Sequence, residues 1–129
     1  MAKLSTHVLD TAAGRPAAGM ELALLRLGSG GRWEHVLSTS TNSDGRCDQP
    51  LLEDAALPRG RYCLRFKVGA YYAAQRDSLA AGGGGAHPGE EDMRFLDEVP
   101  IEFGIADPAQ NYHVPLLVSP WSYTTYRGS

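Results

Sequence analysis

The amino-acid sequence predicts an all-β protein, a β-sandwich with one short helix or helical turn. Short runs in which apolar and polar residues alternate recur along the chain, and turn residues separate them. A side-chain period of two is typical of strands with one face buried. Hydrophobic residues make up 43% of the 129 residues and charged residues 21%, which is ordinary for a single globular core. Two sheets packed face to face would bury the apolar face of each strand.

Seven segments are predicted as strands, and an eighth is expected between residues 47 and 52. The seven cover residues 4–10, 20–27, 32–38, 60–68, 99–105, 111–119 and 122–127. Alternation is clearest in 60–68, where it points four side chains inward: Tyr62, Leu64, Phe66 and Val68. Pro100 lies near the start of its segment and predicts an edge strand, because proline has no N–H to donate to a neighbouring strand.

Residues 70–95 do not alternate. Residues 70–75 suit either a strand end or a helical turn. Around 77–95 we expect a glycine-rich surface insertion, since 82–85 are four consecutive glycines and 82–92 hold almost nothing apolar. This insertion, with His87, is expected to lie in solvent and away from any active site. The whole of 1–129 is otherwise predicted to be one domain.

Composition narrows the function classes. A net charge of −3 argues against a nucleic-acid or anionic-membrane partner, because both favour a basic face. The chain has no apolar run approaching the roughly 18 residues that span a bilayer. Cys47 and Cys63 lack zinc-ligand spacing and are expected to be free thiols in a reducing compartment. We therefore expect the cytoplasm, with the periplasm as the alternative if a leader has been removed.

Two of the histidines are candidates for a catalytic role. His7 and His113 each lie mid-strand on a face that is otherwise apolar, with Leu9 beside the first and Leu117 beside the second. A single histidine in such a place is most often a structural residue with its hydrogen bonds satisfied. The pair matters only if the two side chains meet, which alternation alone does not show.

Two other features help to place these candidates. His35 alternates with Trp33 and Leu37, which predicts a partly buried sheet residue. The polar stretch 39–46 contains Asp44-Gly45, a strong turn signal, and so places Arg46 just beyond a tight turn.

Both ends of the chain resemble the transthyretin-like family. The resemblance is carried by residues 4–11 with 14–17, by 44–46, by 99–101, and most closely by 112–120. The terminal Tyr126-Arg127-Gly128-Ser129 is similar to the 5-hydroxyisourate hydrolase branch of that family rather than to its hormone carriers. The resemblance covers nearly the whole chain and is weakest across 77–95, where the family has a shorter segment with a helix.

This resemblance implies a sandwich of two four-stranded sheets that assembles as a homotetramer, a dimer of dimers. A channel between the dimers would be lined by strands from both ends of each chain, with His7, Arg46 and His113 facing it. The implied reaction is hydrolysis of 5-hydroxyisourate to 2-oxo-4-hydroxy-4-carboxy-5-ureidoimidazoline in urate degradation. The substrate is then a small purine-derived molecule, and neither a cofactor nor a metal is expected.

The implied chemistry suits these side chains. Adding water to a carbonyl needs a base and a positive group for the developing oxyanion. One of His7 and His113 would activate the water while the other orients or protonates the leaving nitrogen, and Arg46 would stabilise the oxyanion with its planar fork. The substrate-binding set is expected to comprise His7, Arg46, Tyr126, Arg127 and Ser129.

Two alternatives come from other classes. A transthyretin-like carrier of small ligands would use the same scaffold, because a fold does not determine function. Such a carrier of an apolar hormone has little need for two histidines and an arginine in its channel. An immunoglobulin-like interaction module would suit the strand count, but the expected Cys-Trp-Cys arrangement is absent from the sequence.

Overall fold

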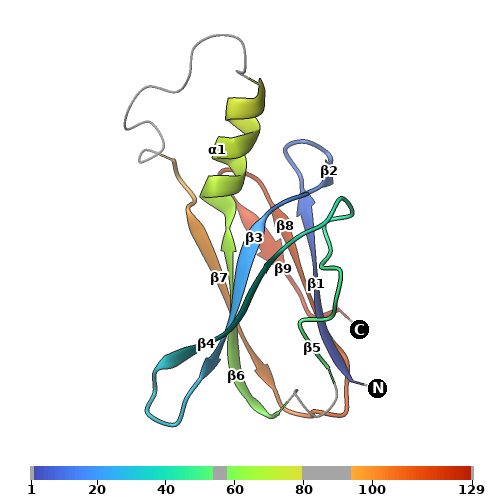
Figure 1. The fold of residues 1–129 in the computed structure, drawn as a ribbon, viewed down its shortest axis with the longest axis vertical. Helices are drawn as coiled ribbons and strands as arrows, with labels where there is room; N and C mark the ends of the chain where they lie inside the picture. The colour runs from blue at the N-terminus through green and yellow to red at the C-terminus, as the bar shows by residue number, and fades with distance from the viewer. Residues whose placement is uncertain (1, 54–57, 80–93, 129) are drawn as a thin grey trace.

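The computed structural model describes residues 2–53, 58–79 and 94–128, and over these it forms two β-sheets packed face to face with one helix beyond their end (Figure 1). The strands are β1 (Lys3–Asp10), β2 (Arg15–Pro16), β3 (Glu21–Leu27), β4 (Trp33–Ser40), β5 (Leu52–Glu53), β6 (Gly60–Lys67), β7 (Glu98–Ile105), β8 (Tyr112–Val118) and β9 (Tyr123–Thr125). The helix is α1 (Val68–Leu79). The predicted all-β sandwich with one short helix is confirmed.

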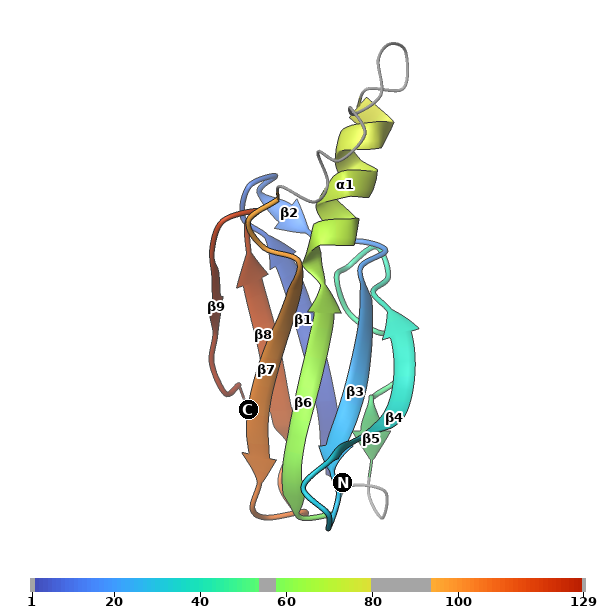
Figure 2. The ribbon, with the colours of Figure 1, turned by 90° about the vertical axis from the view of Figure 1, so that its left-hand side faces the viewer.

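Sheet A contains β2-β1-β8-β9 in that order, and β5 also pairs with β1. Sheet B contains β4-β3-β6-β7. Figure 2 shows the two layers, with β7, β6 and β3 in front and β1 and β8 behind them. Every pairing is antiparallel except that of β1 with β8, which runs parallel from Leu4 opposite Tyr112 to Asp10 opposite Val118. This parallel pair joins the two ends of the chain and positions the site described below.

The core lies between the sheets and follows the predicted alternation. In β1, Leu4 and Val8 are fully buried and Thr6 nearly so, while the residues between them are half-buried on the outer face. The four side chains predicted to point inward from 60–68 are all fully buried. Side chains alternate across a strand, so the same pattern that builds the core sends Ser5, His7 and Leu9 outward.

Several local predictions are sharpened or corrected. Arg15–Pro16 form a two-residue strand, β2, which was not among the predicted strands. The strand expected between 47 and 52 overlaps the two-residue β5 only at Leu52, so its predicted position was wrong. Pro100 lies in an edge strand, as predicted. The prediction for His35 was wrong: it is exposed, because β4 is the other edge strand of sheet B and a register shift at Leu24/Leu25 interrupts its pairing with β3. The predicted insertion around 77–95, with His87, lies mostly outside the described residues.

Helix α1 is tied to the sandwich through a buried carboxylate. Asp10, at the end of β1, is 2% exposed. Its oxygens accept hydrogen bonds from the hydroxyls of Tyr71 and Tyr72, both at 2.8 Å. They also accept bonds from the backbone N–H groups of Ala12 and Ala13 at 3.1 and 3.0 Å. Burial, followed by the hydrogen bond to Asp10, raises the pKa of Tyr71 to about 12, so this phenol stays protonated and donates.

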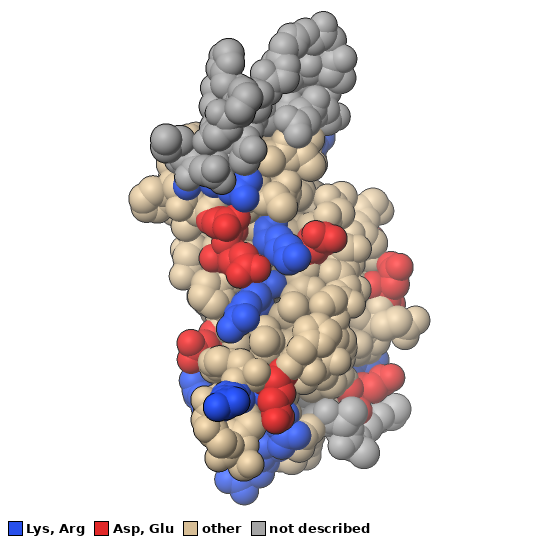
Figure 3. All heavy atoms as spheres, turned by 60° about the vertical axis from the view of Figure 1, so that its left-hand side comes forward, with Lys and Arg blue, Asp and Glu red and all other residues tan. Residues whose placement is uncertain are grey.

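The outer face of sheet B is charged. In the ladder between β6 and β7, Lys67 lies opposite Glu98, and Cys63 lies opposite Glu102. Figure 3 shows basic and acidic side chains interspersed on one face of the molecule. Mixed signs of this kind are typical of a solvated surface rather than of a single-sign binding patch. Within the described ranges, no helix is long and apolar enough to cross a membrane.

Candidate functional site

The register of the parallel β1–β8 pair brings the two candidate histidines to one face. Ser5 lies opposite His113, and His7 lies opposite Pro115. Residues that oppose one another in a ladder share a face, so His7 and His113 are diagonal neighbours on the outer face of sheet A. Leu9 and Leu117 oppose each other further along the same face. The structure thus places the two histidines on one face, as neighbouring positions of adjacent strands, which the sequence alone could not show.

A tight turn places Arg46 beside them. Residue 46 forms a single antiparallel β-bridge with His7, and the N–H of Val8 donates to the carbonyl of Gly45 at 2.8 Å. The turn is organised by Asn42, whose side-chain oxygen accepts hydrogen bonds from the backbone N–H of Asp44 at 2.9 Å and of Arg46 at 3.2 Å. An Asn side chain that bonds to its own chain two residues on is a recurrent turn former. The Arg46 side chain is exposed on this face.

Gly45 is required at this turn for two reasons. Its φ of 76° lies in the left-handed region that disfavours L side chains. A Cβ at this position would also overlap the carbonyl oxygen of Val8 and lie 3.3 Å from Cδ2 of His7. The turn therefore lies directly against β1, and Arg46 follows at a set position.

His7 is oriented by the same turn. Its Nε2 lies 2.9 Å from the carbonyl oxygen of Asp44. A carbonyl only accepts hydrogen bonds, so Nε2 carries the hydrogen and donates it. Nδ1 is then the ring nitrogen that remains for a ligand.

His113 is held on two sides. Its Nδ1 lies 2.8 Å from Oγ of Ser5. On the other side, Gly128 forms a single β-bridge with it and donates its N–H to the His113 carbonyl at 2.7 Å. A Cβ on Gly128 would lie 2.8 Å from Cδ2 of His113, so the glycine backbone packs against the ring. Burial, then the charge of Arg46 and then His7 lower the pKa of His113 below its ordinary 6.5.

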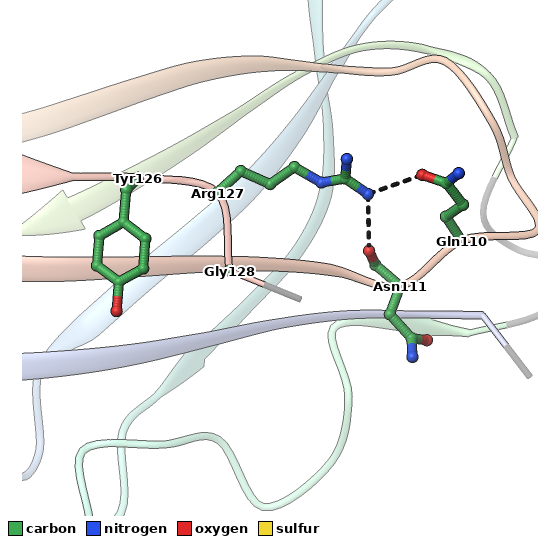
Figure 4. Close-up of a pocket in the computed structure, with 5 residues that line it drawn as sticks. All are labelled: Gln110, Asn111, Tyr126, Arg127 and Gly128. Carbon is green, nitrogen blue, oxygen red and sulfur yellow. Dashed lines mark hydrogen bonds between the residues drawn. The ribbon is translucent and has the colours of Figure 1, made fainter.

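The C-terminal residues predicted to bind substrate lie beside this site in different ways. Tyr126 is 60% exposed and lines an open pocket of about 590 Å³ with Arg127, Gly128 and two residues before β8. The two residues are Gln110 and Asn111. Figure 4 shows the Arg127 side chain extending toward them, while the Tyr126 side chain extends away from them. The Arg127 guanidinium donates to the Gln110 side chain at 2.9 Å and to the Asn111 carbonyl at 3.2 Å. Ser129 lies outside the described residues.

Comparison with known proteins identifies the family. A model of the HIUase/Transthyretin family matches residues 4–128. A 5-hydroxyisourate hydrolase of Ralstonia nicotianae is 49% identical over 129 residues, which is 100% of both chains. The chain belongs to the HIUase/transthyretin family.

Solved structures of similar proteins agree with this. The 5-hydroxyisourate hydrolase of Klebsiella pneumoniae matches with a TM-score of 0.73 and 34% identity, over 100% of both chains. An (S)-allantoin synthase matches with a TM-score of 0.81 and 40% identity over 99% of this chain, which spans 44% of that longer one. The resemblance predicted from the two ends of the sequence is confirmed. The relatives of Ralstonia and Klebsiella carry the hydrolase name that the terminal motif predicted.

Cys47, which directly follows Arg46, is a poor candidate for chemistry within this family fold. Burial, followed by the charge of Asp48, raises the pKa of its thiol, and a protonated thiol is a weak nucleophile. Cys47 and the buried Cys63 are both free. Over the described part of the chain, no group of three or more His, Cys, Asp or Glu side chains is placed to hold a metal ion.

Sequence reasoning missed two residues that build the site. Asn42 has a recognisable signal, because an Asn two positions before Asp44-Gly45 suits the side-chain-to-backbone turn that it forms. Ser5 has no such signal. Its face was predictable from alternation, but its contact with His113 depends on a register between residues 108 positions apart.

Proposed function

We propose that this chain hydrolyses 5-hydroxyisourate, opening the six-membered ring at an acyl C–N bond to give 2-oxo-4-hydroxy-4-carboxy-5-ureidoimidazoline in urate degradation. One observation carries the proposal: two histidines and an arginine converge on one sheet face in a chain that is 49% identical, end to end, to a named 5-hydroxyisourate hydrolase. That set matches what addition of water to a carbonyl requires.

His113 is the general base in this proposal. Its lowered pKa keeps the imidazole neutral near pH 7, and Nε2 is the nitrogen that Ser5 does not occupy. Nε2 takes a proton from water as the water oxygen adds to the substrate carbonyl. The same proton passes to the leaving nitrogen when the C–N bond breaks, so the reaction consumes one water and regenerates the base.

Arg46 and His7 complete the catalytic set. The guanidinium of Arg46 stabilises the oxygen on which negative charge develops. The nearby cation also favours the neutral form of His113, which links the two roles. His7 accepts a hydrogen bond from a substrate N–H at Nδ1 and so orients the ring, since its Nε2 already donates to Asp44.

The C-terminal residues form one side of the substrate site in this proposal. Tyr126 presents an exposed ring two residues before Gly128, which packs against His113, and there it would contact the purine-derived substrate. The pocket of about 590 Å³ that Tyr126 lines includes none of His7, Arg46 and His113, so it would extend the site rather than contain it. Arg127, with its bonds to Gln110 and Asn111, holds the terminal segment in place. Ser129 stays a predicted substrate-binding residue. Gly128 keeps the segment against the ring of His113.

The decisive test is the ultraviolet absorbance of freshly generated 5-hydroxyisourate during its decay. The wild-type chain should accelerate the decay, and His113→Gln should lose about 10²–10⁴-fold in kcat/KM while still folding. His35→Gln is a matched control, because His35 is an exposed histidine on β4 of sheet B. A wild-type chain that does not accelerate the decay would refute the hydrolase and favour a carrier.

We also propose that the chain forms a homotetramer, a dimer of dimers, with a channel lined by the outer face of sheet A. This face carries the half-buried Leu9 and Leu117 beside the site, and Trp121 and Tyr126 are 70% and 60% exposed. Large apolar side chains that a single chain leaves exposed are typical of interaction surfaces. Sedimentation should give four times the chain mass, and a fully active monomer would contradict the assembly.

A cytoplasmic location completes the proposal. Both cysteines are free, which suits a reducing compartment. Fractionation of the source cells should recover the activity with cytoplasmic markers, and recovery with the periplasm would overturn this assignment.

A further inference from the structure

We infer that Ser5 is a positioning residue for the reaction, one whose hydroxyl accepts the Nδ1–H of His113 and thereby presents Nε2 to water. This inference rests on the proposed function and deepens it. Ser5 itself does not contact the reacting atoms in this scheme. It acts through the imidazole.

The surrounding residues restrict the orientation of the His113 ring. Ser5 and His113 are direct partners in the parallel ladder of β1 and β8, so their backbones are held at a set separation. The side chains meet at 2.8 Å between Oγ and Nδ1, in a half-buried environment. Gly128 packs against the Cδ2 edge and blocks displacement of the ring to the other side. A flipped ring would lose the Ser5 bond and place Nδ1 on the side where Gly128 packs.

The direction of the hydrogen bond follows from the role of the ring. A neutral imidazole has one N–H and one free nitrogen. If Ser5 donated to Nδ1, the hydrogen would sit on Nε2, and Nε2 could not take a proton from water. If Ser5 accepts from Nδ1–H, Nε2 is free in the neutral ring, and the same bond persists after Nε2 is protonated. The hydroxyl therefore serves both states of the base without rearranging.

Ser5 is also the side-chain partner that distinguishes the two histidines. His7 donates through Nε2 to a backbone carbonyl, whereas His113 meets a hydroxyl through Nδ1. The two rings consequently expose different nitrogens, Nδ1 of His7 and Nε2 of His113. This difference is consistent with one ring orienting the substrate and the other moving the proton.

The test compares Ser5→Ala and Ser5→Thr in the decay assay. Ser5→Ala should lower kcat by roughly tenfold with KM little changed, which is the size expected for one hydrogen bond realised in the transition state. Ser5→Thr keeps a hydroxyl and should restore most of kcat. The matched control is Ser38→Ala, because Ser38 Oγ lies 2.7 Å from Nε2 of His35 on β4, a similar Ser–His pair in sheet B. Equal kcat in Ser5→Ala and the wild type would overturn the inference.

A pH profile gives a readout that a merely structural role would not move. The charged and titratable groups acting on His113 are Arg46, from the turn at 42–46, and His7, from β1, and both remain in Ser5→Ala. A hydrogen bond from an imidazolium is stronger than one from a neutral ring, so its loss disfavours the charged form. In the wild type, kcat/KM should fall with decreasing pH only below pH 6.5, because the pKa of His113 is lowered. In Ser5→Ala this fall should begin at a still lower pH, because the imidazolium has lost its hydrogen bond. Movement to higher pH would mean that Ser5 donates, and would overturn the assignment.

Nitrogen NMR of the wild-type chain separates failure of this inference from failure of the proposed function. The His113 ring should show a protonated Nδ1 and an unprotonated Nε2 at pH 8, a measurement that needs neither substrate nor a folded variant. The opposite tautomer overturns the role of Ser5 whether or not the chain is a hydrolase. A wild type that does not accelerate 5-hydroxyisourate decay refutes the proposed function, and with it the role given to Ser5.

Discussion

Single residues in this site are held mainly by backbone atoms. A carbonyl orients His7, the N–H of Gly128 bonds to the carbonyl of His113, and a turn lying against β1 delivers Arg46. Ser5 adds a side-chain contact to the ring of His113. Backbone support of this kind has little rotamer freedom to lose, so it positions reacting groups at low entropic cost. Glycines at the two close approaches, Gly45 and Gly128, make it sterically feasible.

Gly45→Ala should test how closely the turn must lie against β1. The new Cβ would overlap the Val8 carbonyl, so the turn must move and carry Arg46 and the Asp44 carbonyl with it. We expect a loss of about 10² in kcat/KM, the usual effect of misplacing a reacting group by about 1 Å. The measurement is the decay assay, with urea unfolding as a check on stability.

Gly14→Ala is the control for this substitution. Gly14 has a similar φ of 71°, but a Cβ there would meet nothing within 4 Å. Both variants therefore share the left-handed backbone strain, which costs about 1–2 kcal/mol, and only Gly45→Ala adds the overlap. Equal activity in the two variants would show that the site tolerates movement of the turn.

At the scale of elements, helix α1 continues directly from β6 and depends on the end of β1. Val68 is buried in line with the inward side chains of β6, yet it is the first residue of the helix. The change from strand to helix is accompanied by hydrogen bonds from Tyr71 and Tyr72 to Asp10. Asp10 lies in the same strand as His7, so the helix anchor and the site share a backbone.

Asp10→Ala should destabilise the fold by about 3 kcal/mol, because it leaves buried hydrogen-bond donors without a partner. The free energy of unfolding in urea measures this loss. Asp97→Ala is the matched control, since Asp97 is 66% exposed in an ion pair with Arg94 at 3.0 Å. An exposed pair contributes about 0–1 kcal/mol. Similar losses in the two variants would show that the Asp10 cluster does not anchor the helix.

Across the whole molecule, the site exists because the two ends of the chain lie side by side. β1 begins the chain, β8 lies near its end, and the segment after β9 returns along β8 to Gly128. Four stretches are thus adjacent on the outer face of sheet A: the terminal segment, β8, β1 and the turn at 42–46.

Deleting residues 126–129 should abolish acceleration of 5-hydroxyisourate decay, with a loss of at least about 10² in kcat/KM. The deletion removes Tyr126 from the pocket and Gly128 from the ring of His113, while β9 ends before it at Thr125. Circular dichroism should show the β-sheet signal retained. Wild-type turnover in the shortened chain would exclude the terminal segment from the site.

Much of the fold and part of the site could be predicted from local sequence patterns. The long strands, their inward faces and the turn before Arg46 follow from alternation and turn chemistry, because side-chain direction in a strand depends only on backbone period. The exposure of His35 and the helix at 68–79 could not be read in this way. They depend on an edge position, a register shift and a buried carboxylate contributed by distant residues.

The sequence by itself determined that this is an all-β sandwich, that His7 and His113 face outward from their strands, and which family the chain resembles. Only the tertiary structure decided that the two histidines share one face beside Arg46, which nitrogen each ring exposes, and that Ser5 contacts His113. The physical reason is that strand register across 108 residues is a property of the packed sheet. Burial of every strand's apolar face selects that register, and no local segment encodes it.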